Sequence, residues 1–278
     1  MQGTLYLVPT PIGNLNDISD RCRATLTQAD FIAAEDTRVS VRLLNHLDLK
    51  KELVSYHEHN KAKSGPRILE RLQNGESCAL VTDAGSPAIS DPGEDLVKLC
   101  ADAGVTVCAI PGPCALVTAL SASGLPTGRF CFEGFLSTVK KAQKAHLESL
   151  KKEQRTMIFY EAPHRLGATL EALLGAFGPD RRISLCRELT KLHEEYFRTT
   201  LQEAVAYYKE NAPRGEFVLV VEGASFSEEA PDLDTALRLV AELMNSGLSR
   251  KDAAKKAAEQ TGLKKNILYE ASLHAETE

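Results

Sequence analysis

The sequence predicts an α/β protein that consists of two successive α/β units followed by a short helical tail. Short apolar runs rich in β-formers alternate with stretches in which apolar residues recur at spacings of three and four. This alternation pauses around residues 134–144 and then resumes. It ends at an acidic, proline-containing stretch, after which no strand pattern follows. With 278 residues, 43% hydrophobic and 26% charged, the chain is long enough for two compact domains.

The first unit contains four strand-like runs bounded by turn residues, at 4–8, 31–35, 78–82 and 105–110. Helical spacing predicts helices between them, at 18–28, 39–46, 61–73 and 93–103. One more helix is opened by Pro113 and closed near Gly124. Strands that alternate with helices in this way favour a mostly parallel sheet wrapped by helices.

The second unit repeats the alternation, with strands expected at 129–134, 156–162, 182–189 and 216–223 and helices at 166–177 and 201–209. Residues 235–274 then have the pattern of two or three short helices. We therefore predict an N-terminal α/β domain over 1–123, a C-terminal α/β domain over 124–228 and a basic helical appendage over 229–278.

Charge and cysteine content narrow the class of protein. The formal net charge is -5, so no protein-wide positive field attracts nucleic acid, and any such site must be a local patch. The seven cysteines are odd in number, lie in apolar runs and form no CxxC pair, which is typical of reduced thiols in a cytoplasmic protein. No stretch has the length or apolarity of a leader or a membrane span, so we expect a soluble protein with no membrane partner.

Three predicted strands end in rigid Gly/Pro loops. These loops are VPTPIGNLND at 8–17, VTDAGSPAISDPGEDL at 81–96 and AIPGPCAL at 109–116. In open α/β sheets ligands bind at the carboxyl ends of the strands, so three such loops favour a cleft for a small polar ligand held by main-chain groups. A ligand-free turn and a simple helix entry at Pro92 are the structural alternatives. The spacing is not GxGxxG, so the usual dinucleotide fingerprint is absent.

These motifs, together with AAEDTR, FYEAPHR, RELTK and GEFVLVVEG, resemble the tetrapyrrole methylase superfamily in order and spacing from Gly3 to about Tyr269. They most resemble its branch that 2′-O-methylates a cytidine of 16S rRNA in the decoding region of the small ribosomal subunit. Tetrapyrrole members carry GDP where this chain has Gly85, Ser86 and Pro87, which shifts the nearby acid to Asp83 or Asp91 and favours the RNA branch. The resemblance implies two α/β domains, S-adenosylmethionine (SAM) in the cleft between them, and a homodimer.

The resemblance also implies which residues contact SAM. Most are small or apolar, so recognition rests on main-chain N–H and C=O groups. They are Pro11, Ile12, Gly13, Ala84, Gly85, Ser86, Ile89, Cys114, Ala115, Glu161 and Leu189.

The acceptor side follows from chemistry. A ribose 2′-OH is a poor nucleophile until its proton is removed or strongly hydrogen-bonded. A lysine with a lowered pKa next to a carboxylate could act as the base, so we predict Lys191 with Glu188 or Glu161 as the catalytic group. A structural ion pair is the alternative. Further polar residues near strand ends are candidates for contacting RNA: Asn14, Arg38, His57, Asn60, Arg165 and Arg187.

Two of these segments have plain structural interpretations as well. In AEDTR, Asp36 or Thr37 can cap the following helix, whereas Arg38 can meet an RNA phosphate. In HEHN at 57–60 the two histidines would share one face of an extended segment. No third ligand is apparent, so we predict no metal, an N-cap role for Asn60 and a substrate contact for His57.

Two basic stretches complete the candidates. Residues 137–155 and residues 249–266 each contain six basic and two acidic side chains. Such runs are often solvated helix faces, but in an acidic protein they favour phosphate contact. The second stretch resembles a helix-turn-helix, with Ala253, Ala254, Ala257 and Ala258 in tight packing and Leu263, Ile267 and Leu268 closing a small core. Its lysines at 255, 256, 264 and 265 are predicted to contact rRNA, although a lid or dimer element is an alternative.

The sequence thus predicts a SAM-dependent rRNA methyltransferase. One alternative is another enzyme, a methylase of a small tetrapyrrole-like metabolite on the same scaffold. The other is an RNA-binding module without catalysis that senses a nucleotide or SAM.

Overall fold

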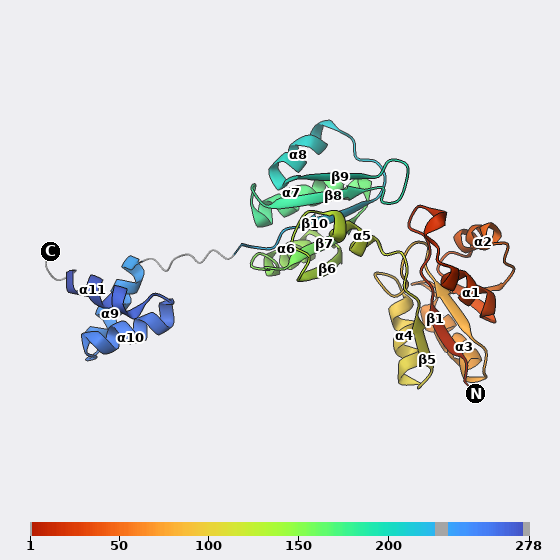
Figure 1. The fold of residues 1–278 in the computed structure, drawn as a ribbon, viewed down its shortest axis with the longest axis horizontal. Helices are drawn as coiled ribbons and strands as arrows, with labels where there is room; N and C mark the ends of the chain where they lie inside the picture. The colour runs from red at the N-terminus through yellow and green to blue at the C-terminus, as the bar shows by residue number, and fades with distance from the viewer. Residues whose placement is uncertain (1, 226–232, 275–278) are drawn as a thin grey trace. The chain divides into compact units, whose positions relative to one another are not determined.

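In the computed structural model, a five-stranded parallel sheet with strand order β3-β2-β4-β1-β5 forms the first half of the chain (Figure 1). Its strands are β1 (Thr4–Leu7), β2 (Phe31–Ala34), β3 (Glu52–Ser55), β4 (Cys78–Val81) and β5 (Thr106–Ala109). All four pairings are parallel, so the predicted parallel sheet is confirmed. The edge strand β3 was not predicted, because ELVS is partly exposed and too short to show a strand pattern.

Helices cover both faces of this sheet. They are α1 (Asp20–Gln28), α2 (Thr37–His46), α3 (Lys61–Gln73) and α4 (Gly93–Asp102), with a 3₁₀ turn η1 at Leu15–Asp17. Leu26 and Leu44 pack with Ile32 on one face, and Leu72 and Leu96 pack with Phe31 on the other. The four predicted helices are therefore confirmed, with boundaries shifted by at most two residues.

The second half contains a mixed sheet with strand order β6-β7-β10-β8-β9. Its strands are β6 (Phe130–Phe135), β7 (Thr156–Glu161), β8 (Arg182–Arg187), β9 (Glu195–Thr200) and β10 (Phe217–Val221). Only β6 and β7 pair in parallel, and the central strand β10 is antiparallel to both neighbours. Four of these strands match the prediction. The fifth, β9, was missed because EYFRTT is a polar, partly exposed edge strand.

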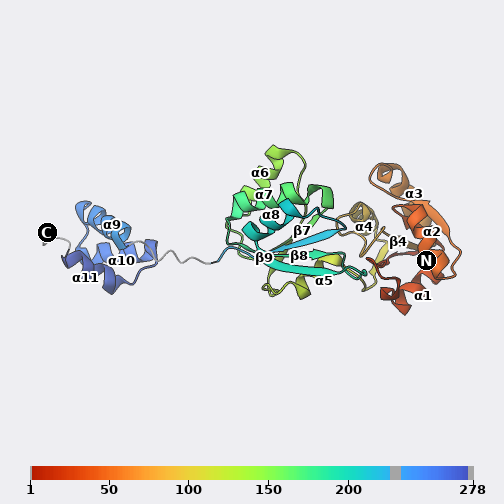
Figure 2. The same ribbon diagram turned by 90° about the horizontal axis from the view of Figure 1, so that it is seen from above.

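The helices of the second half are α5 (Ala115–Ala122), α6 (Lys140–Ser149), α7 (Leu166–Phe177) and α8 (Leu201–Glu210), with a 3₁₀ turn η2 at Pro163–Arg165. Figure 2 shows α6, α7 and α8 on one side of the second sheet and α5 on the other. The predicted pause around 134–144 is wrong over its second half, because α6 begins at Lys140. Leu116 and Leu120 of α5 pack on Ile158 and Val218 of the second sheet, so this helix joins the second core.

The two α/β halves form one compact unit over residues 1–224, and residues 225–278 form another. The structure describes residues 2–225 and 233–274, and the predicted boundary at 228/229 lies outside them. The tail contains α9 (Leu233–Asn245), α10 (Arg250–Thr261) and α11 (Lys265–His274). Within the described ranges we find no helix with the length and apolarity needed to cross a bilayer.

The tail has a small core of its own. Ala253, Ala254 and Ala257 of α10 are fully buried together with Val240 and Leu268. Ser249 caps α10 at its start, and Gly262 ends the helix at a φ of 76°, as the predicted Thr-Gly turn requires. One predicted core residue is wrong, since Ile267 is 46% exposed.

Candidate active site

Two strand-end loops of the first sheet are joined by backbone hydrogen bonds. The N–H of Thr10 donates to the carbonyl of Gly85 at 2.9 Å, and the N–H of Gly85 donates to the carbonyl of Thr10 at 3.0 Å. Gly85 has a φ of 89°, and a Cβ there would lie 3.3 Å from Cγ2 of Ile12. The position thus needs glycine both for its backbone conformation and for its close approach to the first loop.

Asp91 organises the turn that follows. Its carboxylate accepts hydrogen bonds from the backbone N–H groups of Ala88, Ile89 and Gly93 at 3.0, 3.3 and 2.7 Å. Ala88 and Ser90 are left-handed, at φ values of 66° and 67°. Desolvation raises the pKa of Asp91 despite these bonds. Asp91 therefore stabilises the turn.

A loop from the second half lies against the first loop. A Cβ at Gly13 would lie 2.5 Å from Cγ of Lys191 and 3.0 Å from the carbonyl oxygen of Leu189. Lys191 Nζ contacts Oε1 of Glu188 at 2.9 Å and Oε2 of Glu216 at 2.7 Å. Glu188 Oε1 also accepts the backbone N–H of Glu216 at 3.0 Å. An ion-paired network thus fixes this loop.

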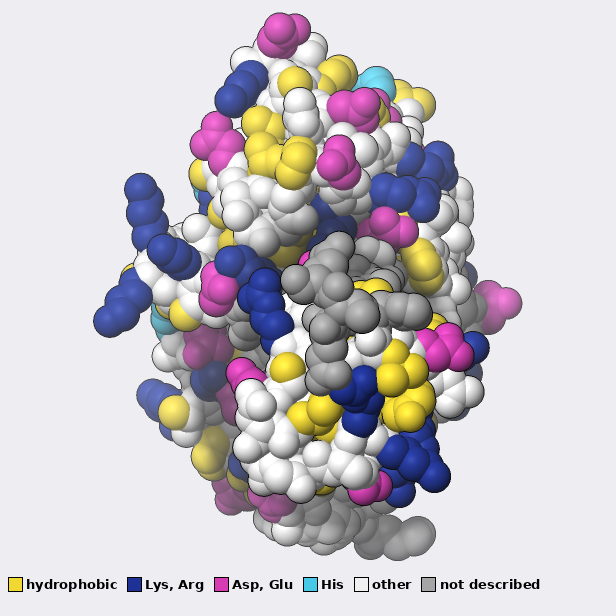
Figure 3. Space-filling view, turned by 90° about the vertical axis from the view of Figure 1, so that its left-hand side faces the viewer, with side chains coloured by type: hydrophobic (Ala, Val, Ile, Leu, Met, Phe, Trp, Pro, Cys, Tyr) yellow, Lys and Arg dark blue, Asp and Glu magenta, His cyan; other side chains and the backbone are white. Residues whose placement is uncertain are grey.

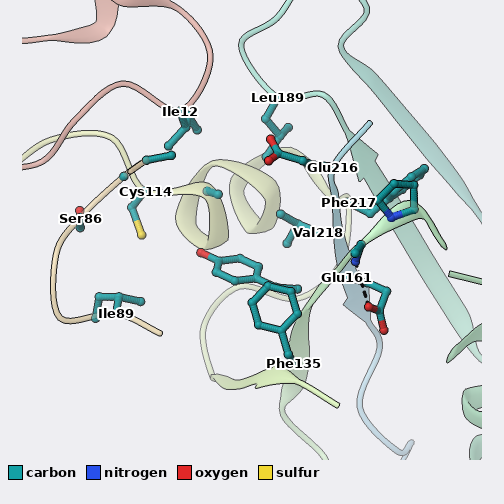
Figure 4. Close-up of a pocket in the computed structure, with 16 residues that line it drawn as sticks. Ile12, Ser86, Ile89, Cys114, Phe135, Glu161, Leu189, Glu216, Phe217 and Val218 are labelled. Atoms are coloured by element: carbon teal, nitrogen blue, oxygen red, sulfur yellow. Dashed lines mark hydrogen bonds between the residues drawn. The ribbon is translucent and has the colours of Figure 1, made fainter. Parts of the chain in front are cut away.

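The loops enclose a pocket of about 410 Å³, which we call the first pocket (Figure 4). Figure 4 shows Ile12, Ile89 and Cys114 along one side and Phe135, Leu189 and Val218 along the other. Nine residues predicted to contact SAM line it: Ile12, Ala84, Gly85, Ser86, Ile89, Cys114, Ala115, Glu161 and Leu189. Pro11 and Gly13 do not, and they line a neighbouring pocket instead. The assignment of these residues to SAM binding stays a prediction.

Seven lining residues were missed by the sequence analysis: Phe135, Tyr160, Ala162, Pro163, Glu216, Phe217 and Val218. Tyr160, Ala162 and Pro163 flank Glu161 in the FYEAP motif, which was a usable signal. The last three lie at the start of β10, where Glu216 directly precedes the strand and Phe217 and Val218 are its first two residues. Because β10 is antiparallel to β7 and β8, its start meets their carboxyl ends, with Phe217 opposite Glu161 and Arg187. The run EFVLVV does not reveal that direction.

Tyr160 connects the second sheet to α5. Its hydroxyl accepts the backbone N–H of Leu116 at 3.2 Å, in the first turn of that helix. Its ring has edge contacts with Phe132 and Phe135 at centroid distances of 4.9 and 5.7 Å. Burial raises the pKa of Tyr160 to about 12, so the phenol stays protonated at neutral pH.

Glu161 places a carboxylate in the wall of the first pocket, and its side chain is fully buried. Oε1 accepts the backbone N–H of Ala162 at 2.9 Å, drawn as a dashed line in Figure 4, and lies 3.4 Å from Nε of Arg165. Oε2 accepts the hydroxyl of Thr169. These bonds satisfy the buried group and fix its orientation.

The structure brings Lys191 and Glu188 together. The prediction that the pKa of Lys191 is lowered, as a general base requires, is wrong. Burial lowers the pKa of Lys191, but the hydrogen bonds to Glu216 and Glu188 outweigh this and raise it above its ordinary value. A lysine in this state is an ammonium ion at neutral pH. The geometry therefore matches the ion-pair alternative.

The residues outside the tail that are predicted to contact RNA are dispersed over both α/β halves. Asn14 caps η1, and Arg38 has an 87% exposed side chain paired to Asp36 at 2.6 Å. Asp36 also caps α2, as predicted. Arg165 faces Glu161 and donates to the carbonyl of Leu136, and Arg187 pairs with Glu195 at 2.8 Å. Arg38 is therefore the exposed cation of this set.

The HEHN segment forms a turn, so the extended conformation expected for it is wrong. Asn60 stands at the N-cap of α3 without a capping bond, because its Oδ1 accepts the N–H of His57 instead. The two histidine rings lie 6.0 Å apart. Among the described residues we find no group of three or more His, Cys, Asp or Glu side chains arranged to hold a metal.

The lysines predicted to contact rRNA in the tail lie at its surface. Lys255, Lys256 and Lys264 are exposed, and Lys265 is partly exposed. Figure 3 faces the tail and shows Lys and Arg side chains beside hydrophobic ones. The buried alanines of α10 lie on the opposite side of that helix from Lys255 and Lys256, so these two lysines face away from the small core of the tail.

Residues 4–205 match the family of tetrapyrrole (corrin/porphyrin) methylases, and residues 229–276 match the RsmI C-terminal HTH domain. Among curated proteins, the ribosomal RNA small subunit methyltransferase I of Synechocystis is 49% identical over 99% of both chains. The protein of that name from Bacillus subtilis is 48% identical over 97% of this chain and 94% of its own length.

Solved structures share the fold over about four fifths of the chain. Uroporphyrin-III C-methyltransferase from Thermus thermophilus has a TM-score of 0.57 at 22% identity and covers 79% of this chain and 94% of its own. A cobalt precorrin-4 methyltransferase has a TM-score of 0.60 at 18% identity, with the same coverage. A further Thermus structure, in complex with S-adenosylhomocysteine, has a TM-score of 0.57 at 19% identity and covers 78% and 97%.

Proposed function

Because the chain belongs to the tetrapyrrole methylase family, and within it to the ribosomal RNA small subunit methyltransferase I proteins, we propose that it 2′-O-methylates a cytidine in the decoding region of 16S rRNA with SAM as methyl donor. The observation that carries this proposal is the similarity to those relatives over nearly the whole length of both chains. It includes the tail, whose residues 229–276 match the RsmI C-terminal HTH domain.

The first pocket fits SAM. Its volume of about 410 Å³ lies in the ordinary range for small-molecule sites, and most of its lining is apolar. The close approach at Gly85 leaves main-chain groups, rather than side chains, to face a ligand. The residues that would hold SAM are the predicted ones that line the first pocket: Ile12, Ala84, Gly85, Ser86, Ile89, Cys114, Ala115, Glu161 and Leu189. When bound, SAM supplies a methyl group on a sulfonium ion.

The contribution of this chain to methyl transfer is positioning and exclusion of water. An acceptor oxygen must lie in line with the S–CH₃ bond, and precise orientation of that kind accounts for much of an enzymatic rate. The apolar side chains of Phe135, Val218 and Leu189 exclude water from the pocket. The buried carboxylate of Glu161, which is bonded to Ala162 and Thr169 and lies beside Arg165, gives the same wall a fixed polar group. Lys191 and Glu188 hold the loop of Leu189 against Gly13.

Lys191 is thus a positioning residue in this proposal. Lys191→Ala should lower kcat about tenfold, as expected when one charge-assisted contact is lost, and should change the affinity for SAM little. The pH–rate profile should keep its shape, and Lys191→Arg should restore most of the rate. A profile whose rising limb, along which the rate increases as a base loses its proton, disappears in Lys191→Ala would instead identify Lys191 as the base.

We further propose that the basic stretches at 137–155 and 249–266 contact rRNA phosphates, including Lys255 and Lys256 on the exposed face of α10. Their charge, in a chain with a net charge of -5, supports this role. The proposed substrate implies a cytoplasmic enzyme, and the family resemblance supports a homodimer. Light scattering of the purified protein tests the dimer.

The function is tested by mass spectrometry of nuclease-digested 16S rRNA from cells with and without the gene. Loss of a ribose-methylated cytidine in the decoding region, restored by the wild-type protein, is the expected result. A cytidine that stays methylated would overturn the rRNA proposal and favour a small tetrapyrrole-like acceptor. Transfer of label from SAM to small subunits in a single turnover separates an enzyme from a SAM-sensing binding module.

A further inference from the structure

A second pocket, of about 220 Å³, lies beside the first and has no role in the function proposed above. It is formed by the 10–15 loop, the first two turns of α2 and the end of β4. Leu15, Val39 and Leu43 give it apolar walls, and the first two are 45% and 37% exposed. Thr10, Ser40 and Thr82 are buried polar residues of its lining.

The two pockets lie on either side of the same two loops, which contain residues 10–13 and 82–86. Ile12, Ala84 and Gly85 line the first pocket, whereas the adjacent residues Pro11, Gly13, Thr82 and Asp83 line the second. The pair of hydrogen bonds between Thr10 and Gly85 joins the two loops to each other. A molecule in the second pocket therefore contacts the same loops that hold the ligand of the first.

Two charged side chains line the second pocket and are free to bind a ligand. Asp83 Oδ1 accepts the backbone N–H of Asp36 at 3.1 Å, and no donor to Oδ2 is found among the described residues. Arg42 is exposed and has no hydrogen bond or ion pair within the described ranges. Arg38, by contrast, is held by Asp36 through three hydrogen bonds from its guanidinium.

This combination of groups fits a nucleotide. Apolar side chains contact the faces of a base, and a carboxylate accepts from the exocyclic amino group of cytosine, adenine or guanine. An unpaired arginine binds phosphate. A pocket about half the volume of the first has room for a single base but not for a molecule of the size of SAM.

We propose that the second pocket binds one unpaired nucleotide that flanks the methylated nucleotide, with its base against Leu15 and Val39, its amino group on Asp83 and its phosphate on Arg42. The proposal rests on the rRNA function proposed above and adds a base-reading subsite to it. Holding the neighbouring nucleotide would place the acceptor ribose relative to the first pocket. It would also favour RNA whose bases are splayed out over RNA in a duplex.

The proposal is tested with Asp83→Asn, which keeps the shape of the side chain and an oxygen that can accept from Asp36. Methyl transfer is measured on small subunits that carry each of the four bases at each nucleotide flanking the methylated one. The wild type should discriminate against uridine at one of these positions by about tenfold in KM, and Asp83→Asn should reduce that ratio below about twofold. The matched control is Asp102→Asn, which removes an exposed carboxylate that lines neither pocket.

Arg42→Ala gives an independent readout. It should weaken binding of all the variant subunits about equally and reduce the slope of log affinity against log salt by about 1, as loss of one phosphate contact does. Arg21→Ala, which removes an exposed arginine of α1 outside both pockets, should leave both the affinity for the variant subunits and the salt slope unchanged. SAM affinity, measured by calorimetry, should be unchanged in Asp83→Asn and Arg42→Ala.

The outcomes separate this inference from the proposed function. If the wild type methylates small subunits but Asp83→Asn and Arg42→Ala behave like their controls, the subsite is wrong and the rRNA function stands. If Asp83→Asn weakens binding equally whatever base flanks the acceptor, the pocket binds something other than a base, such as a protein segment of the subunit, and the inference is overturned. If the wild type transfers no methyl group to small subunits, the proposed function itself fails.

Discussion

The two walls of the first pocket are built from different parts of the chain. The first half contributes loops whose glycines, prolines and small residues present the backbone, held by the Thr10–Gly85 hydrogen bonds and by the carboxylate of Asp91. The second half contributes side chains, chiefly Phe135, Tyr160 and Glu161. Adding a Cβ to the main-chain wall should weaken ligand binding, whereas the side-chain wall should bind less tightly when side-chain atoms are removed from it.

The largest effect is expected from adding side-chain atoms to the main-chain wall. Gly85→Val should lower SAM affinity at least a hundredfold in calorimetry, because a β-branched residue would occupy a left-handed backbone position only 3.3 Å from Ile12. Gly104→Val is the matched control, since Gly104 also has a positive φ but has no atom within 4 Å of a Cβ. It should lose a similar amount of stability and keep SAM affinity. Equal loss of affinity in both variants would contradict the main-chain wall.

A smaller effect is expected from deleting part of the side-chain wall. Tyr160→Ala removes a partly buried ring and its two aromatic contacts, and it should weaken SAM binding about thirtyfold. Tyr160→Phe keeps the ring and loses only the bond from the N–H of Leu116, so about threefold is expected. Titration of both variants with SAM provides the measurement. Similar losses in the two variants would show that the hydroxyl, rather than the ring, determines the affinity.

The same contrast explains what the sequence could predict. The loops at 10–13 and 84–89 contain glycines and prolines that indicate turns, and most of their residues predicted to contact SAM line the first pocket. Glu216, Phe217 and Val218 reach it only because β10 lies between β7 and β8 and runs antiparallel to both. Strand order and direction depend on contacts between segments far apart in the chain, and no short pattern encodes them. The edge strands β3 and β9 were missed for a related reason, since partly exposed polar strands lack a continuous apolar run.

The charge state of Lys191 could not be predicted either. The RELTK motif indicated a lysine three residues after a glutamate, and the structure confirms that contact. The second carboxylate belongs to Glu216, in the loop that precedes β10. Its hydrogen bond with Lys191 helps to raise the pKa of the lysine, which disfavours the role of a base. A pKa depends on every charge that surrounds the group, and sequence spacing reveals only the neighbours along the chain.

The smallest effect is expected where the two walls meet, at the ion pair of Glu188 and Lys191. The hydrogen bond from Lys191 lowers the pKa of Glu188 below its ordinary value of 4.5. Its stabilising contribution is therefore fully present above about pH 4.5 and is lost as the pH falls through the lowered pKa of the folded state. Glu188→Gln should cost about 1 kcal/mol of unfolding free energy at pH 7 and almost nothing at the acid end of that range.

Urea unfolding of the wild type and Glu188→Gln between pH 3 and pH 8 measures this difference. Glu203→Gln is a suitable control, because the pKa of Glu203 is also lowered, by hydrogen bonds from Thr199 and Thr200 at the start of α8, which lies outside both pockets. Both variants should lose stability with the same dependence on pH, but only Glu188→Gln should also weaken methyl transfer. If Glu188→Gln leaves transfer unchanged, the loop of Leu189 does not need this ion pair to hold its place against Gly13, and the two walls are positioned independently of each other.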